Sequence, residues 1–174
     1  PPVSVVQNFD LPAPEGEPLL KEDFAVVPGK PWVQVRGTWL AKGGALWGAQ
    51  SSEDKIGAAL RGPGGFTDAT LQYDLFFDGA AAHTVRIQLA AADHVVNVAV
   101  NRHQISIVRQ RPEGEDGPRT EVIAQADLSL RTGRWYPLRI TMKGDQLTVQ
   151  TGGVTVSAQH PVLAEEKKAF ALMV

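Results

Sequence analysis

Apolar and polar residues alternate along most of this chain. In the clearest run, residues 70–77, Leu71, Tyr73 and Leu75 alternate with polar residues. A period of two puts the apolar side chains on one face of a β-strand and the polar side chains on the other. The same alternation is found in residues 84–91, 96–101, 138–143, 147–149, 154–156 and 170–174. This pattern is typical of antiparallel sheets that cover a core on one side only.

Turn sequences separate these segments. Lys143-Gly144-Asp145-Gln146 and Gly152-Gly153 each predict a tight hairpin. Asn101-Arg102-His103 predicts a third, because asparagine tolerates positive φ. Residues 62–65 predict a break in the chain, and residues 112–118 predict a solvated loop. No segment has a clear apolar stripe at helical spacing, and we expect at most a helical turn near residues 163–168.

Many short strands with turns between them predict an all-β domain built as a sandwich of antiparallel sheets. A chain of 174 residues has the usual size of one domain, so we expect residues 1–174 to form a single β-sandwich. Residues 1–31 are rich in proline and the least regular. We expect them to be irregular or to add an edge strand, for which residues 3–6 are the candidate.

Composition narrows the classes of partner. The net charge is −2 and the basic residues are scattered among acidic ones, which argues against nucleic acid. The absence of cysteine excludes disulfides, cysteine-ligated zinc and thiol catalysis. No apolar run approaches the roughly 18 residues of a membrane-spanning helix, so we expect no membrane insertion. The chain begins Pro1-Pro2 and shows no signal-peptide pattern. We expect a secreted or periplasmic bacterial protein whose signal peptide is not part of this sequence.

Three groups of residues resemble motifs of concanavalin A-like sandwich domains. They are Gly37-Thr38-Trp39 with the glycine-rich residues 43–48, the strand in residues 66–75, and the hairpin in residues 133–149 that begins Gly133-Arg134-Trp135. The resemblance spans residues 32–174 and is to the bacterial 3-keto-disaccharide hydrolase domains. It implies a two-sheet antiparallel jelly-roll sandwich. Residues 80–83 and 95–98 differ from the motifs that this family often carries there, so no active-site residue carries over.

The residues indicate no catalytic or metal site. Laminarinase-like enzymes on this fold carry Glu-x-Asp-x-x-Glu along one strand, because glycoside hydrolysis needs two carboxyl groups about 5 Å apart. This chain has no such run. Asp74 and Asp78 share one face of a predicted strand, and we expect them to be solvated or ion-paired. The four histidines are dispersed, so we expect no metal and no other cofactor.

The polar face of two central strands supplies the candidate ligand-binding residues. Arg86 and Gln88 lie on one predicted strand, and Asn97 and Asn101 lie on the next. The short connection at residues 93–94 predicts that these strands are antiparallel neighbours. The four side chains would then share one surface, and planar polar groups of this kind bind sugar hydroxyls. The alternative interpretation is an ordinary solvated sheet face.

Two further residues are assigned to this candidate site. Trp47, or Phe76, would supply a ring beneath the apolar face of a sugar. Asp74 would join Arg86 in the cleft if the protein were a hydrolase. The remaining tryptophans are expected in the core, because large aromatic side chains are usually buried. They are Trp32, Trp39 and Trp135.

Three functions fit these observations. The first is a carbohydrate-binding or carbohydrate-associated module that acts through the concave face of one sheet. The second is a glycoside hydrolase of the 3-keto-disaccharide type. The third is a non-catalytic structural or interaction domain of a larger cell-surface protein. An open polar groove favours the first, two close carboxylates favour the second, and a featureless convex surface favours the third.

Overall fold

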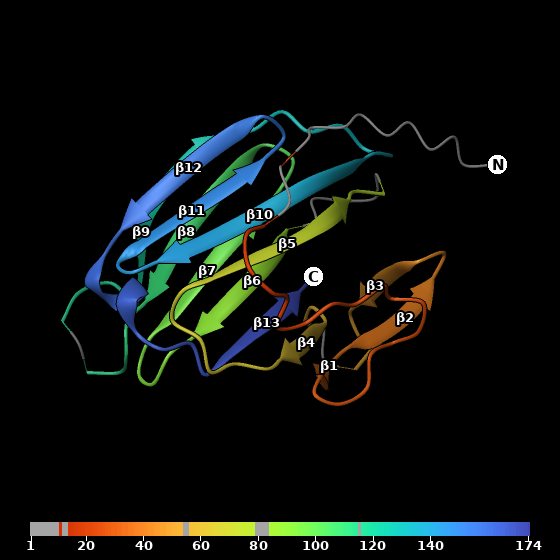
Figure 1. Ribbon diagram of the computed structural model, residues 1–174, viewed down its shortest axis with the longest axis horizontal. Helices are drawn as coiled ribbons and strands as arrows, with labels where there is room; N and C mark the ends of the chain where they lie inside the picture. The colour runs from red at the N-terminus through yellow and green to blue at the C-terminus, as the bar shows by residue number, and fades with distance from the viewer. Residues whose placement is uncertain (1–10, 12–13, 54–55, 79–83, 115) are drawn as a thin grey trace.

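The computed structural model describes residues 11, 14–53, 56–78, 84–114 and 116–174. The regular structure in this part of the chain consists of β-strands and one short 3-10 helix, η1 (Pro161–Ala164). Figure 1 shows two sheets stacked face to face, with a small hairpin at one end. The predicted all-β sandwich is confirmed. The described residues include no helix that is long and apolar enough to cross a membrane.

The larger sheet has seven strands, all antiparallel to their neighbours. In spatial order they are β1 (Val33–Arg36), β4 (Ala59–Gly62), β13 (Ala169–Met173), β6 (Val85–Ala90), β7 (Val95–Val100), β8 (Gln104–Gln110) and β9 (Thr120–Asp127). The expected pairing of the strands on either side of residues 93–94 is confirmed. β13 lies between β4 and β6, so a strand from the end of the sequence joins two early parts of the sheet.

The smaller sheet has four strands. In spatial order they are β12 (Val154–Gln159), β11 (Gln146–Thr151), β10 (Trp135–Lys143) and β5 (Ala69–Phe76). The hairpins predicted at residues 143–146 and 152–153 connect β10 to β11 and β11 to β12. A separate hairpin consists of β2 (Thr38–Lys42) and β3 (Ala45–Ala49).

Six strands lie outside the segments that alternation predicted: β1, β2, β3, β4, β8 and β9. The longest two of them, β8 and β9, show why the pattern failed. β8 begins with a regular pattern, because Ile105 and Ile107 are buried, but its next core-facing residue is Arg109. β9 pairs with β8 through a register shift near Ile107. A charged residue at a core position and a bulge each interrupt a period of two, which explains why the sequence pattern is weak here.

The core lies between the inner faces of the two sheets. It is built from the apolar residues that alternate along the strands, and each fully buried leucine or isoleucine contributes about 1.5–3 kcal/mol. The largest fully buried side chains are Leu60, Ile87, Leu89, Val98, Val100, Ile105, Ile107, Leu138, Ile140, Met142, Leu147 and Leu163. The period-two pattern therefore identified the inner face of both sheets.

The N-terminal segment completes the core beside β5, where the smaller sheet ends (Figure 1). Trp32 is buried and packs edge-on against Phe170 of β13, with ring centroids 5.3 Å apart. Its indole Nε1 donates a hydrogen bond to Glu22 at 2.9 Å. The described residues before β1 form no strand, and residues 3–6, the candidate edge strand, lie outside the described residues.

The three tryptophans expected in the core do not behave alike. Trp32 and Trp39 are buried, but Trp135 is 47% exposed, so the prediction is wrong for Trp135. Leu138 takes the inner face of β10, which puts the odd-numbered residues of that strand outside. Trp135 pairs with Phe76 on the outer face.

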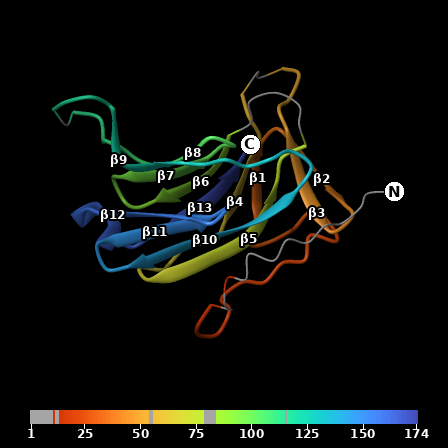
Figure 2. The same ribbon diagram turned by 90° about the horizontal axis from the view of Figure 1, so that it is seen from above.

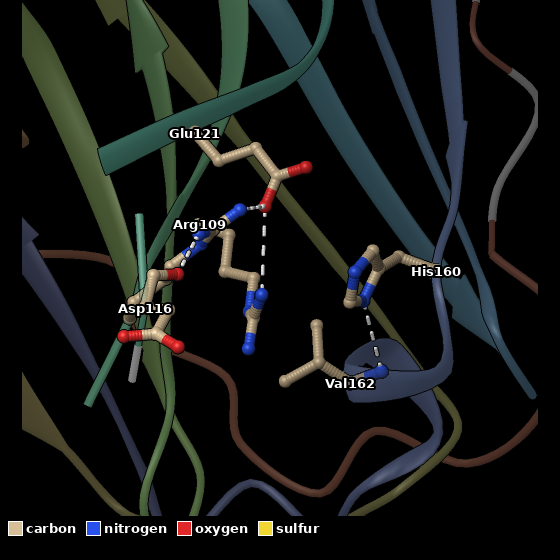
Figure 3. A network of polar contacts seen from close by, with 6 residues as sticks. Arg109, Asp116, Glu121, His160 and Val162 are labelled. Atoms are coloured by element: carbon tan, nitrogen blue, oxygen red, sulfur yellow. Dashed lines mark hydrogen bonds and ion pairs between the residues drawn. The ribbon is translucent and has the colours of Figure 1, made fainter. Parts of the chain in front are cut away.

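An ion-pair network joins β8, the following Arg111 and β9 at the edge of the seven-stranded sheet (Figure 3). The Glu121 Oε2 atom accepts hydrogen bonds from Arg111 Nη2 at 3.1 Å and from Arg109 Nη1 at 3.4 Å. Because Arg109 is buried, its charge requires a nearby carboxylate. The hydrogen bond from Arg111 is the main cause that holds the pKa of Glu121 below its ordinary value.

A separate polar contact fixes η1 (Figure 3). The His160 Nδ1 atom accepts a hydrogen bond from the backbone N–H of Val162 at 3.2 Å. Pro161 follows as the first residue of the helix, where a fixed φ and a missing N–H cost nothing. These two residues explain why the turn begins before the predicted residues 163–168.

We predict opposite outcomes for two tryptophan substitutions. Trp39→Ala removes a side chain that is 6% exposed and should lower the free energy of unfolding by about 3–5 kcal/mol. Trp135→Ala should cost less than about 1 kcal/mol, as surface changes do. Urea denaturation of both variants measures the difference. Equal losses would show that Trp135 supports the core.

We predict that Glu121→Gln lowers the melting temperature at pH 7. The carboxylate has a lowered pKa in the folded state, so its stabilisation is present above its ordinary pKa of 4.5 and is lost as the pH falls below that value. The gap between the wild type and the variant should therefore narrow as the pH falls below 4.5. Glu113→Gln, in the exposed β8–β9 loop, is the control and should follow the wild type throughout. A gap that stays constant between pH 7 and pH 3 would contradict the ion-pair explanation.

Candidate functional site

A straight row of side chains crosses the outer face of the seven-stranded sheet, the face that points away from the core. The register of the strands aligns Val33, Arg61, Ala171, Gln88, Asn97, Val108 and Val122 from β1 to β9. The strands pair as predicted, and their register puts Gln88 directly opposite Asn97. The sequence therefore identified the centre of this row.

A parallel row runs beside the first. It consists of Arg36, Ala59, Met173, Arg86, Ala99, Ser106 and Gln125. Small and long side chains neighbour one another in both rows. Arg86 stands on β6 between Met173 and Ala99, one step along the strand from Gln88.

Part of this outer face is recessed. Asn97 is only 7% exposed although it points away from the core, and Ala59 and Ala171 are also buried outside the main core cluster. Longer side chains around these short ones exclude solvent from them. Figure 2 shows the described parts of the β8–β9 and β3–β4 connections extending beyond this face at opposite ends of the strands.

The Asn97 carboxamide carries hydrogen-bonding groups that the protein does not use. Its side chain makes no hydrogen bond with any residue that the structure describes, and neither does the side chain of Gln88. Two carboxamides that face outward at adjacent positions offer both donors and acceptors to a bound molecule.

Positive charge gathers on the same face. Arg36, Arg61 and Arg86 all lie in the two rows. Arg36 Nε donates a hydrogen bond to the carbonyl of Gly57 at 2.9 Å. Arg61 and Arg86 are exposed and form no ion pair or side-chain hydrogen bond with the described residues. The sequence did not identify Arg36 or Arg61 as candidate site residues. For Arg61, the apolar neighbour Leu60 was a signal that the arginine faces outward on a strand.

Asn101 directly follows β7, and unlike Asn97 it forms side-chain hydrogen bonds with the protein backbone. Its Oδ1 atom accepts hydrogen bonds from the backbone N–H groups of His103 at 2.8 Å and Gln104 at 2.9 Å. Asparagine often closes turns in this way. Although Asn101 has the same parity as Asn97, its side-chain oxygen is committed to the predicted β7–β8 hairpin.

The structure separates Asp74 and Trp47 from Arg86. Asp74 pairs with Pro137 on the outer face of the four-stranded sheet. The prediction that Asp74 and Arg86 share one cleft is therefore wrong. β5 and β6 follow each other in the sequence but belong to different sheets, so their outer faces point in opposite directions.

Trp47 belongs to an aromatic cluster at one end of the four-stranded sheet. Trp47 packs edge-on against Phe76 with ring centroids 6.0 Å apart, and Phe76 lies 5.0 Å from Trp135. Trp47 is 41% exposed, so this cluster is also open to solvent. The expectation that Trp47 or Phe76 lies beneath a molecule bound at Arg86 is therefore wrong.

Acidic side chains are scarce on the outer face of the seven-stranded sheet. Among its described strand residues, the only acid that points outward is Asp127, on the edge strand β9 opposite Gln104. The two close carboxyl groups that glycoside hydrolysis requires are not present among these residues. What the described residues of this face provide is hydrogen bonding and positive charge.

Comparisons with known proteins establish the fold. No family model matches this sequence, and no curated protein sequence matches it. Carbohydrate binding module CBM66 from Bacillus subtilis superposes with a TM-score of 0.60 at 16% identity, covering 82% of this chain and 91% of that one. A β-1,3-1,4-glucanase (lichenase) from a mouse hindgut metagenome superposes with a TM-score of 0.59 at 12% identity, covering 87% and 83%. The chain has the concanavalin A-like jelly-roll fold that these proteins share.

Proposed function

We propose that this domain binds a saccharide, without catalysis, through the outer face of the seven-stranded sheet. The observation that carries the proposal is the adjacent pair Gln88 and Asn97, whose carboxamides face outward and have no partner among the described residues. Sugar hydroxyls donate and accept hydrogen bonds in the same way as carboxamides, so the two groups complement each other. The recessed position of Asn97 shields such bonds from water, which strengthens them.

The structural neighbours support the same class of ligand. One is named as a carbohydrate binding module and the other as a glucanase. We favour binding over hydrolysis of the 3-keto-disaccharide type, despite the motif resemblance in residues 32–174. Asp127 is the single outward acid among the described strand residues of this face, and a hydrolase needs a second carboxyl group or a base.

The proposal predicts that glycan binding depends on Gln88 and not on the opposite sheet. A glycan array identifies a ligand for the wild type, and isothermal titration then measures the affinity. Gln88→Ala should weaken binding roughly 3- to 10-fold, the range expected for loss of one neutral hydrogen bond. The melting temperature should stay nearly constant, since Gln88 makes no hydrogen bond with the described residues.

Gln150→Ala is the matched control. Gln150 lies on the outer face of β11 in the four-stranded sheet, and its substitution should leave the affinity unchanged. If Trp135→Ala abolishes binding and Gln88→Ala does not, the site lies at the aromatic cluster instead. If the array detects no glycan for the wild type, the proposal is wrong and an interaction domain becomes the better interpretation.

A further inference from the structure

The distribution of charge over the molecule is uneven in a way that bears on the ligand. The chain has 19 acidic and 17 basic residues, so acidic side chains are abundant. Even so, three arginines lie in the two rows of the outer face, and the outward acid on the described strands, Asp127, lies at the β9 edge. Elsewhere, Arg109 and Arg111 share the carboxylate of Glu121.

Arg61 and Arg86 are placed to act on one bound molecule. They lie on β4 and β6, on either side of β13, and are offset by one outward position along the strands. With strands about 4.8 Å apart and about 3.4 Å per residue, their Cα atoms are roughly 12 Å apart. Arginine side chains are long enough to approach each other over the small Ala171 between them, or to hold neighbouring units of one oligomer.

The chemistry of these groups specifies an anion. Each guanidinium has a planar fork of donors that matches a carboxylate or a sulfate in bidentate geometry. Two arginines without an acidic partner among the described residues create a positive potential that attracts such a group. The outward residues of the seven strands include no aromatic ring. A neutral sugar bound to these strands would therefore lack the aromatic stacking partner that sugars often have in protein binding sites.

We infer, on the basis of the proposed function, that the ligand is an anionic saccharide whose negative groups are bound by Arg61 and Arg86. The two carboxamides then contact the sugar hydroxyls, and the guanidinium groups contact the carboxylates of uronic acids or the sulfates of sulfated sugars. Arg36, held by the carbonyl of Gly57, extends the positive surface toward β1.

A matched pair of ligands tests this inference. One is an oligomer of galacturonic acid, and the other is the same oligomer with its carboxyl groups reduced to alcohols. The wild type should bind the acidic form at least about tenfold more tightly near 50 mM salt, and this preference should shrink at high salt because ions screen exposed charges. A sulfated oligosaccharide, compared with its desulfated form, separates sulfate from carboxylate as the preferred anion.

Three variants, each replacing one arginine by glutamine, show which residues cause the preference for the anionic ligand. Arg61→Gln and Arg86→Gln should each reduce the advantage of the anionic over the neutral ligand about tenfold. Arg139→Gln, on the outer face of the four-stranded sheet, is the control and should keep the full preference. Equal binding of the charged and neutral forms, or array hits confined to neutral glycans, would overturn this inference while leaving saccharide binding intact.

Two other results are informative. Tighter binding of single-stranded DNA than of any anionic glycan would overturn the inference by identifying a different class of ligand. Absence of binding to every glycan on the array would refute the proposed function itself, together with this inference.

Discussion

The pairing of β13 between β4 and β6 is the contact on which the rest of the structure depends. It joins residues 169–173 to strands that lie about 80 to 110 positions earlier in the chain. On the inner face, Phe170 packs with Trp32 and extends the core beyond β5. On the outer face, Ala171 connects Arg61 to Gln88 in one row. Without this strand, the seven-stranded sheet would be two separate pieces and the candidate site would have no continuous floor.

The pairing of β4 with β13 relies on short residues on each face. On the inner face, Gly62 lies so close to Phe170 that a Cβ atom there would lie 2.4 Å from the aromatic ring. On the outer face, the short residues are alanines. Ala59 and Ala171 become buried outside the core, and the arginine side chains of β4 and β6 stand above them. Stability and the shape of the candidate site thus depend on the same short strands.

The two sheets present different chemistry to solvent. The outer face of the seven-stranded sheet carries carboxamides and arginines, and the end of the four-stranded sheet carries the cluster of Trp47, Phe76 and Trp135. These surfaces lie on opposite sides of a closed core, so one small ligand does not contact both. The aromatic cluster and the arginines therefore belong to two separate candidate surfaces.

The sequence by itself determined which residues face the core and which face solvent, because the side-chain period of a strand is two wherever the strand is regular. It also determined the tight hairpins, because glycine and asparagine allow the backbone angles that such turns need. On this basis Gln88 and Asn97 were predicted to be neighbours, and parity would also have put Trp135 outside. Tertiary structure alone decided which strands share a sheet, because pairing between distant segments depends on packing and not on local pattern. For this reason the sequence did not show that β13 places Arg61 beside the candidate site, or that Asp74 lies on the other sheet. β8 and β9 were not predicted because a buried arginine and a bulge interrupt their period-two pattern.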